Sequence, residues 1–141
     1  MSIELFTWPT PNGRKISIAL EELGLEYNAH GVNIGKDEQF APEFLKISPN
    51  NKIPAIVDND NGRSMMESGA ILLYLVDKTG QLGGDDSWVT LEWLMVQMGG
   101  VGPMLGQANH FLKFNEGKSE YAEARYANEA RFGVLLSLIH N

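Results

Sequence analysis

Residues 1–78 alternate between strand patterns and helix patterns, and this alternation constrains the fold more than any other feature of the chain. Ile3 to Trp8 is a short alternating segment with β-branched and aromatic residues, which predicts a strand. An apolar helix face follows at once, carried by Ile16, Ala19, Leu20 and Leu23. Strand and helix patterns continue to alternate up to residue 78, and together they predict the element order β-α-β-α-β-β-α. The opening β-α-β unit implies two parallel strands joined by a right-handed crossover, and therefore an α/β fold.

The pattern changes after residue 78. Residues 79–87 are polar and glycine-rich, which predicts a linker. From residue 88 to residue 141 the apolar positions recur at helical spacing, so we expect an all-α domain there. The glycine-rich stretch from Gly99 to His110 is expected to kink or break the first long helix of this domain.

Composition excludes several classes of function. The chain has no cysteine, which leaves neither a disulfide framework nor a thiolate metal site, and its 3 histidines show no metal-ligand spacing. The net charge is −7 without a basic cluster, which argues against a nucleic-acid surface. No apolar run reaches the roughly 18 residues of a membrane helix. The first residues lack a secretory signal, so we expect a cytoplasmic protein.

The turn Thr10-Pro11-Asn12-Gly13 connects the first strand to the first helix. Thr10 is expected to be the N-cap, with proline at the first helical position. Strand–turn–helix segments of this kind carry a Cys-x-x-Cys pair in redox folds, which this chain lacks. Two interpretations follow from the residues alone. The turn is either a capped helix start only, or an anion or thiolate site built on the free N–H groups of the helix.

Two further stretches place polar groups at the ends of elements. In "NNKIPAI" (50–56) a proline interrupts a strand pattern, which suggests a cis Ile53-Pro54 bond with the Ile53 backbone free for an extended ligand. Lys52 could there meet a carboxylate. In "MESGA" (66–70) Ser68 is expected to cap a helix. Alternatively, Glu67, with Gly69 allowing a ligand to approach the backbone, could hold the ammonium and carboxylate groups of an amino acid.

Together and in this order, the stretches resemble the glutathione S-transferase superfamily, with the best match to its bacterial Nu class and to the related yeast nitrogen-regulation prion protein. The resemblance rests on "SPNNKIPAIVD" (48–58), "ESGAILLYL" (67–75) and "GGVGPMLGQ" (99–107), and it extends to about Leu135. It implies a thioredoxin-like N-terminal domain that binds glutathione as a co-substrate, and no metal. It also implies a homodimer that forms through the helices near Glu67 and Trp88.

The resemblance also implies roles for individual residues. The Ile53 backbone would pair with the cysteinyl part of glutathione, and Glu67 and Ser68 would hold its γ-glutamyl end. Thr10 and Asn12 would lie at the thiol. The remaining expected contacts with glutathione are Gln39, Lys52 and, from the helical domain, Arg125.

The chemistry expected of Thr10 and Asn12 follows from their side chains. Neither is a base near neutral pH, but both can donate a hydrogen bond to a thiolate. Lowering a thiol pKa by two units requires about 2.7 kcal/mol. A hydrogen bond to a charged group supplies ~1.5–3 kcal/mol, and a helix N-terminus adds ~0.3–1 kcal/mol. The sulfur of glutathione can therefore act without a tyrosine or cysteine of the protein.

The expected activity is thiol–disulfide exchange, in which the glutathione thiolate attacks a disulfide. Conjugation of glutathione to an electrophile is the alternative within enzymes. A binding or regulatory module without catalysis is the alternative outside them. The helical domain is expected to be shortened relative to the family, which would leave an apolar face from Phe132 to Ile139 partly uncovered. The resemblance implies that the pocket for a second substrate is built largely from the further helices of the family.

Overall fold

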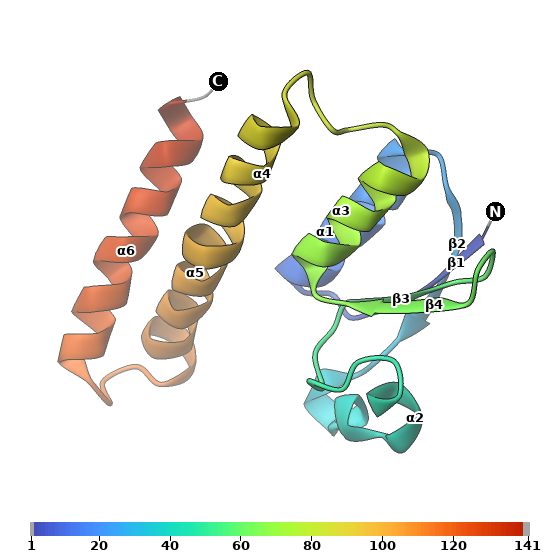
Figure 1. Cartoon of the computed structure of the whole chain (residues 1–141). Coiled ribbons are helices and arrows are strands. Elements are labelled where there is room, and N and C mark those ends of the chain that lie inside the picture. Colours follow the sequence, from blue (N-terminus) through green and yellow to red (C-terminus); the bar gives the residue numbers. More distant parts are fainter. Residues whose placement is uncertain (1, 140–141) are drawn as a thin grey trace. The chain divides into compact units, whose positions relative to one another are not determined.

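The computed structural model describes residues 2–139, with side chains from residue 2 to residue 131. The chain separates into two compact units, Met1–Asp85 and Asp86–Asn141. Figure 1 follows the chain from the sheet-containing first unit to the helices of the second. The finer division into residues 1–78, 79–87 and 88–141 stays a prediction.

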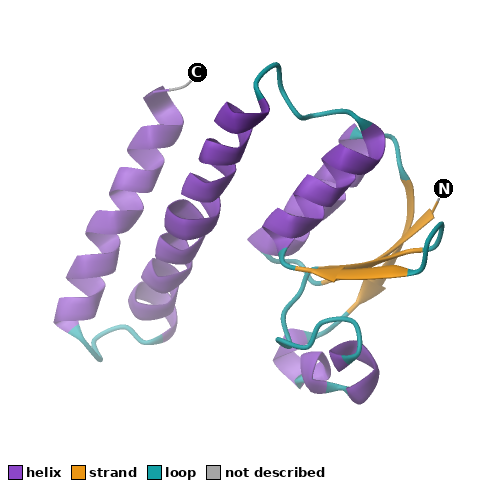
Figure 2. Ribbon diagram, viewed as in Figure 1, coloured by secondary structure: helices purple, strands orange, loops and turns teal. Residues whose placement is uncertain are grey.

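The first unit contains a four-stranded sheet with helices on both faces (Figure 2). The strands are β1 (Ser2–Thr7), β2 (Glu26–Gly31), β3 (Ala55–Asp58) and β4 (Arg63–Met66), in the spatial order β2-β1-β3-β4. The helices are α1 (Pro11–Glu22), α2 (Pro42–Leu45) and α3 (Ser68–Thr79), with the short 3₁₀ turns η1 (Ile34–Lys36) and η2 (Glu38–Phe40). β1 is parallel to β2 and antiparallel to β3, and β3 is antiparallel to β4.

The main core lies between the sheet and the helix pair α1 and α3. β1 alternates across the sheet, so Ile3 and Leu5 face these helices and are buried. They pack with Ile16, Leu20, Ile56, Ile71 and Leu75, all fully buried. On the other face, α2 places Phe44 against Ala55 and Phe6. Figure 1 shows α1 and α3 on one face of the sheet and α2 on the other.

This order of elements confirms the predicted thioredoxin-like α/β fold. Thr10 is the N-cap of α1 and Pro11 its first residue, as expected. Gly24, at φ 62°, lies in the left-handed region just beyond the Leu23 C-cap, a conformation that costs glycine little. The expectation that Ser68 caps α3 is wrong, because Glu67 occupies the N-cap position and Ser68 is the first helical residue.

The second unit is helical, as predicted. It contains α4 (Ser87–Val96), η3 (Gln97–Val101), α5 (Gly102–Asn109), η4 (His110–Phe114) and α6 (Glu120–Ile139). The Asp86 carboxylate caps α4 by accepting from the Trp88 N–H at 2.9 Å. Of the expected kink or break, the break is not found, and the kink stays a prediction. The chain instead passes through a π-helical turn at Gln97–Val101 and continues as α5.

The described side chains of the second unit form little core. Only Ala108 is buried among them. Phe111 and Tyr126 join the helical run to α6 by stacking, with ring centroids 5.4 Å apart. The apolar face expected from Phe132 to Ile139 lies outside the side chains that the structure describes. Within the described part of the chain, no helix is long and apolar enough to cross a membrane.

Candidate functional site

The register of the sheet brings three separate segments to one edge of the first unit. Phe6, near the end of β1, pairs with Ala55 at the start of β3. Ala55 also pairs with Met66 at the end of β4. The turn after β1, the residues before β3 and the residues after β4 therefore lie at the same edge. We call this edge, formed by residues 8–13, 50–54 and 67–68, the glycine-turn edge.

The first segment is the start of α1. The Thr10 side-chain oxygen accepts from the Gly13 N–H at 3.1 Å, and the Thr10 N–H donates to the Trp8 carbonyl at 2.6 Å. Gly13 has no room for a side chain, because an added Cβ would lie 2.4 Å from both the Thr7 Oγ1 and the Trp8 carbonyl oxygen. Glycine therefore allows the helix to begin directly against the end of β1.

Thr10 and Asn12 present hydrogen-bond donors at this turn. The Thr10 oxygen is already an acceptor, and its hydroxyl hydrogen has no acceptor among the described residues. The Asn12 carbonyl oxygen accepts from the Lys15 ammonium at 2.9 Å, which leaves its NH₂ group without a partner in the described part of the chain. Both donors are exposed or half-buried beside the N–H groups of a helix start, a combination that suits an anion.

The second segment contains the expected cis bond between Ile53 and Pro54. It follows a turn in which the Asn51 N–H donates to the Ser48 carbonyl at 2.9 Å. The buried Ser48 hydroxyl lies 2.8 Å from the Lys52 carbonyl oxygen, so this loop is held from inside. The Ile53 N–H and C=O have no hydrogen-bond partner among the described residues. Free main-chain groups of this kind can pair with an extended peptide ligand.

The third segment is the junction of β4 and α3. Glu67 has φ 70° and ψ 114°, a conformation that costs a non-glycine residue about 1–3 kcal/mol. Its carboxylate accepts from the Asn50 amide at 2.8 Å. Asn50 in turn accepts from the Ser48 hydroxyl at 2.9 Å. Ser68 is buried at the first position of α3.

Asn50 was missed by sequence reasoning, which treated this stretch as a polar loop. It joins the second segment to the third, because its amide binds Glu67 while its own oxygen is bound by Ser48. The signal available in the sequence was an asparagine in a turn next to the strand proline. Its partner lies 17 residues further on, so no local pattern could identify the pair.

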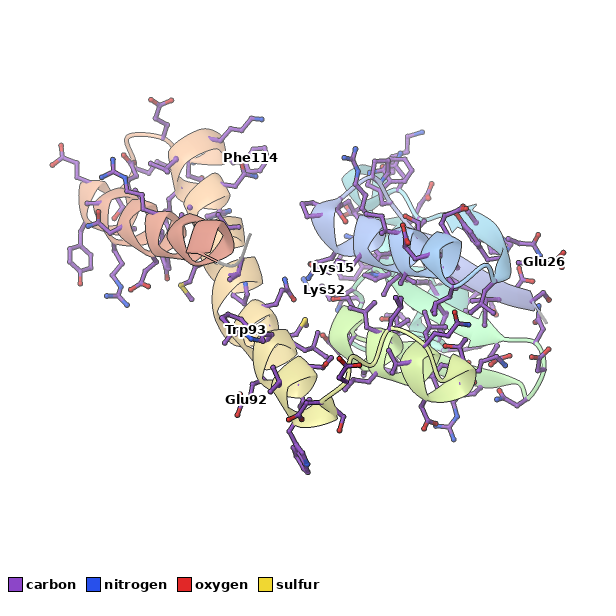
Figure 3. All side chains as sticks on the ribbon, turned by 90° about the horizontal axis from the view of Figure 1, so that it is seen from above. Lys15, Glu26, Lys52, Glu92, Trp93 and Phe114 are labelled. Carbon is purple, nitrogen blue, oxygen red and sulfur yellow. The ribbon has the colours of Figure 1, made fainter. Side chains whose placement is uncertain are left out.

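Lys52 and Gln39 differ in their surroundings. The Lys52 side chain is exposed, and its ammonium pairs with no described acidic group. Figure 3 shows Lys15 and Lys52 projecting from the same side of the first unit. Gln39 lies in η2, with its carbonyl oxygen buried and without a hydrogen-bond partner in the described residues. The Gln39 NH₂ group lies 3.5 Å from the Asp37 carboxylate.

Arg125 lies on α6 in the second unit. Its guanidinium pairs with Glu129 at 3.2 Å, one helical turn away. The other seven expected site residues all belong to the first unit, and six of them, all except Gln39, lie on the glycine-turn edge. The described residues include no group of three or more His, Asp or Glu side chains that could hold a metal ion.

This fold and edge define a thioredoxin-like domain that presents helix-start donors beside a main-chain segment without hydrogen-bond partners among the described residues. The model of the glutathione S-transferase N-terminal domain matches residues 1–77. The chain belongs to the glutathione S-transferase family.

The relatives include enzymes and a regulator. The disulfide-bond oxidoreductase YfcG of Escherichia coli K12 is 51% identical over 137 residues, which is 92% of this chain and 64% of that protein. The transcriptional regulator URE2 of Saccharomyces cerevisiae is 42% identical over 137 residues, 89% of this chain and 39% of that protein. A glutathione transferase of Pseudomonas putida, solved with one glutathione disulfide per subunit, superposes with a TM-score of 0.89 at 46% identity. That alignment covers 99% of this chain and 64% of the other.

The chain spans less than two thirds of the length of these relatives. The family model and most of the expected glutathione contacts fall within residues 1–77, so the shared region includes the whole glycine-turn edge.

Proposed function

We propose that this chain binds glutathione at the glycine-turn edge and uses the glutathione sulfur for thiol–disulfide exchange. The observation that carries the proposal is the juxtaposition of two donors at a helix start, Thr10 and Asn12, with the unpaired main chain of Ile53. The chain has no cysteine of its own, so a sulfur reaction at this turn requires a thiol ligand. A relative named as a disulfide-bond oxidoreductase supports this activity.

In the proposed complex the main chain of glutathione runs antiparallel to Ile53 and exchanges hydrogen bonds with its N–H and C=O. The γ-glutamyl carboxylate lies at the N-terminus of α3, near Ser68, and the γ-glutamyl ammonium faces Glu67. Lys52 and Gln39 are further proposed glutathione contacts, and the Lys52 ammonium suits a carboxylate of the ligand. Arg125 of the helical unit stays a proposed glutathione contact.

The proposed reaction is a thiolate exchange. The thiol loses its proton to solvent, and Thr10 and Asn12 donate hydrogen bonds to the resulting sulfur anion. The anion attacks one sulfur of a disulfide, a new S–S bond forms, and the other sulfur leaves as a thiolate that takes up a proton. No electrons pass to or from the protein. Its residues lower the pKa of the bound thiol and hold the sulfur in position.

Two alternatives have specific support. Conjugation of glutathione to an electrophile uses the same thiolate and is favoured by relatives described as glutathione transferases. A role without catalysis is favoured by the relative described as a transcriptional regulator. We further propose that the protein is a cytoplasmic homodimer.

Thermal unfolding with glutathione, glutathione disulfide and no ligand tests whether the edge binds its ligand. We expect millimolar glutathione to raise the melting temperature, because a ligand that binds only the folded state stabilises it. No rise with either form would contradict the proposed site. Reduction of 2-hydroxyethyl disulfide, compared with conjugation of a chloronitrobenzene, then separates the activities. Faster conjugation than disulfide reduction would replace the proposed reaction by the transferase alternative.

A further inference from the structure

Asn12 and Lys15 form a side-chain pair on the first turn of α1. The Lys15 Nζ lies 2.9 Å from the Asn12 Oδ1, and the two residues are three positions apart on one face of the helix. Lys15 is not among the expected glutathione contacts, and its side chain takes no part in the N-cap bond of α1. Its one described partner is the residue proposed to contact the sulfur.

The pair determines which end of the Asn12 amide faces outward. An ammonium group has three hydrogens and no lone pair, so it can only donate. The amide atom next to Lys15 must therefore be the carbonyl oxygen. The NH₂ group consequently points away from Lys15, and it has no acceptor among the described residues. Without Lys15 the amide could rotate and present its oxygen to the ligand, which would repel a sulfur anion.

The ammonium also adds charge behind the donor. A hydrogen bond from a cation to the carbonyl oxygen polarises the amide, and hydrogen bonds in such a chain strengthen one another. The thiolate proposed at the other end of the amide would therefore meet a stronger donor than an isolated asparagine supplies.

We infer that Lys15 is a positioning residue for the sulfur site, which orients the Asn12 amide with its NH₂ toward the glutathione thiolate and places a positive charge behind it. This inference rests on the proposed function. It assigns Lys15 no contact with the ligand. Its effect on the thiol must therefore pass through Asn12.

The neighbouring Arg14 supplies a matched control. It carries the same charge on the same helical turn and is exposed, and its side chain has no partner among the described residues. Lys15→Met and Arg14→Met each remove one cation and keep a residue that favours a helix. Lys15→Arg retains both the charge and a donor.

The experiment is a pH titration of the thiolate absorbance near 240 nm for glutathione bound to each variant. We expect Lys15→Met to raise the pKa of the bound thiol by about one unit, because a charge-assisted bond is lost. Lys15→Arg is expected to stay near the parent value, and Arg14→Met to shift the pKa by less than half as much as Lys15→Met. At a pH below the thiol pKa of both complexes, the dissociation constant of glutathione should change less than about twofold, because there the ligand binds as the neutral thiol.

The variant Asn12→Ala and the double variant Asn12→Ala with Lys15→Met test whether Lys15 affects the thiol pKa through Asn12. If Lys15 acts through Asn12, then Lys15→Met has little further effect once Asn12 is alanine. The inference is overturned if Lys15→Met and Arg14→Met shift the thiol pKa equally, or if the effect of Lys15→Met persists undiminished in the double variant.

Failure of the proposed function gives a different result. If the parent protein does not bind glutathione, or if Asn12→Ala leaves the thiol pKa unchanged, the thiolate site itself is contradicted. If Asn12→Ala raises the thiol pKa and Lys15→Met does not, the site stands and only the role of Lys15 fails. The melting temperature of each variant without ligand shows that these differences arise in folded protein.

Discussion

The Lys78 ammonium lies 2.7 Å from the carboxylate of Asp58, which is fully buried at the end of β3. Lys78 comes from the last turn of α3, and its side chain is 13% exposed. The Tyr74 hydroxyl and the Asp60 N–H also donate to Asp58. Burial of Asp58 opposes its ionisation, but these three donors together hold its pKa below the usual range for aspartate. The pair joins the β3–β4 hairpin to α3 on the side away from the glycine-turn edge.

Lys78→Met is expected to destabilise the first unit by about 3 kcal/mol, because it leaves a buried carboxylate without its cation. Urea unfolding measures the loss. The matched control is Lys46→Met, which breaks an exposed pair with Glu43 and should change stability by less than ~0.5 kcal/mol. Equal effects of the two variants would contradict the structural role of the Asp58–Lys78 pair.

Stability is expected to fall in acid through Glu4. Hydrogen bonds from His30, Asn28 and Asn59 lower the Glu4 pKa from 4.5 to about 2. A carboxylate whose pKa is lowered in the folded state stabilises the protein at pH values above its pKa in the unfolded state. That stabilisation is lost as the pH falls from about 4.5 toward about 2.

The free energy of unfolding, measured between pH 6 and pH 2.5, tests this dependence. Glu4→Gln should flatten the curve below pH 4.5, because the titrating group is gone. Glu43→Gln, at an exposed glutamate paired with Lys46, should leave the curve close to that of the parent. A curve for Glu4→Gln as steep as that of the parent would show that Glu4 does not carry the effect.

Gly13→Ala is expected to destabilise the start of α1 by about 1–3 kcal/mol, because its Cβ would overlap the Trp8 carbonyl and the Thr7 hydroxyl. Gly106→Ala, in α5, is the matched control. Nothing lies within 4 Å of its added Cβ, so it should stabilise the helix by roughly 0.5–1 kcal/mol. Thermal unfolding distinguishes the two directions, and a stabilising Gly13→Ala would exclude the close approach.

Thr10→Ala and Asn12→Ala are expected to lower the turnover of disulfide reduction more than the affinity for glutathione. Each variant removes a donor to the thiolate, which is worth ~1.5–3 kcal/mol, or roughly tenfold or more in rate. Steady-state kinetics and glutathione binding are measured on the same preparations. Intact turnover with weakened binding would remove the proposed thiolate role from these residues.

Asn50→Ala is expected to weaken glutathione binding about fivefold while turnover at saturation changes little. The amide of Asn50 holds the Glu67 carboxylate, so its loss loosens the proposed γ-glutamyl contact without touching the sulfur. Asn28→Ala removes an asparagine that donates to Glu4 on another part of the sheet, and it should leave glutathione affinity unchanged. A larger loss of turnover than of affinity in Asn50→Ala would place Asn50 nearer the sulfur.

Much of the glycine-turn edge could be predicted from the sequence, because the patterns that indicate it are local. A threonine before a proline predicts a helix start, a proline in a strand pattern suggests a cis bond, and each was found where expected. The roles of the site residues came from the resemblance to a family, since no local rule distinguishes a thiolate site from an ordinary helix cap.

The N-cap residue of α3 could not be predicted from local sequence rules. Serine is a favoured N-cap, yet the chain places Glu67 there with a left-handed backbone. The antiparallel register of β3 and β4 ends at Met66, and the bond from Asn50 holds the next residue in place. Tertiary contacts therefore outweigh the N-cap preference of serine and determine which residue occupies the N-cap position of α3.

The sequence by itself determined the order of elements and the start of α1, because each depends on residues within one helical turn or one strand. Only the tertiary structure decided that three distant segments share one edge, that Asn50 binds Glu67, and that Lys78 neutralises Asp58. Those pairings join residues 17 or 20 positions apart. They form only because the sheet register and the packing of α3 bring the partners within hydrogen-bond distance.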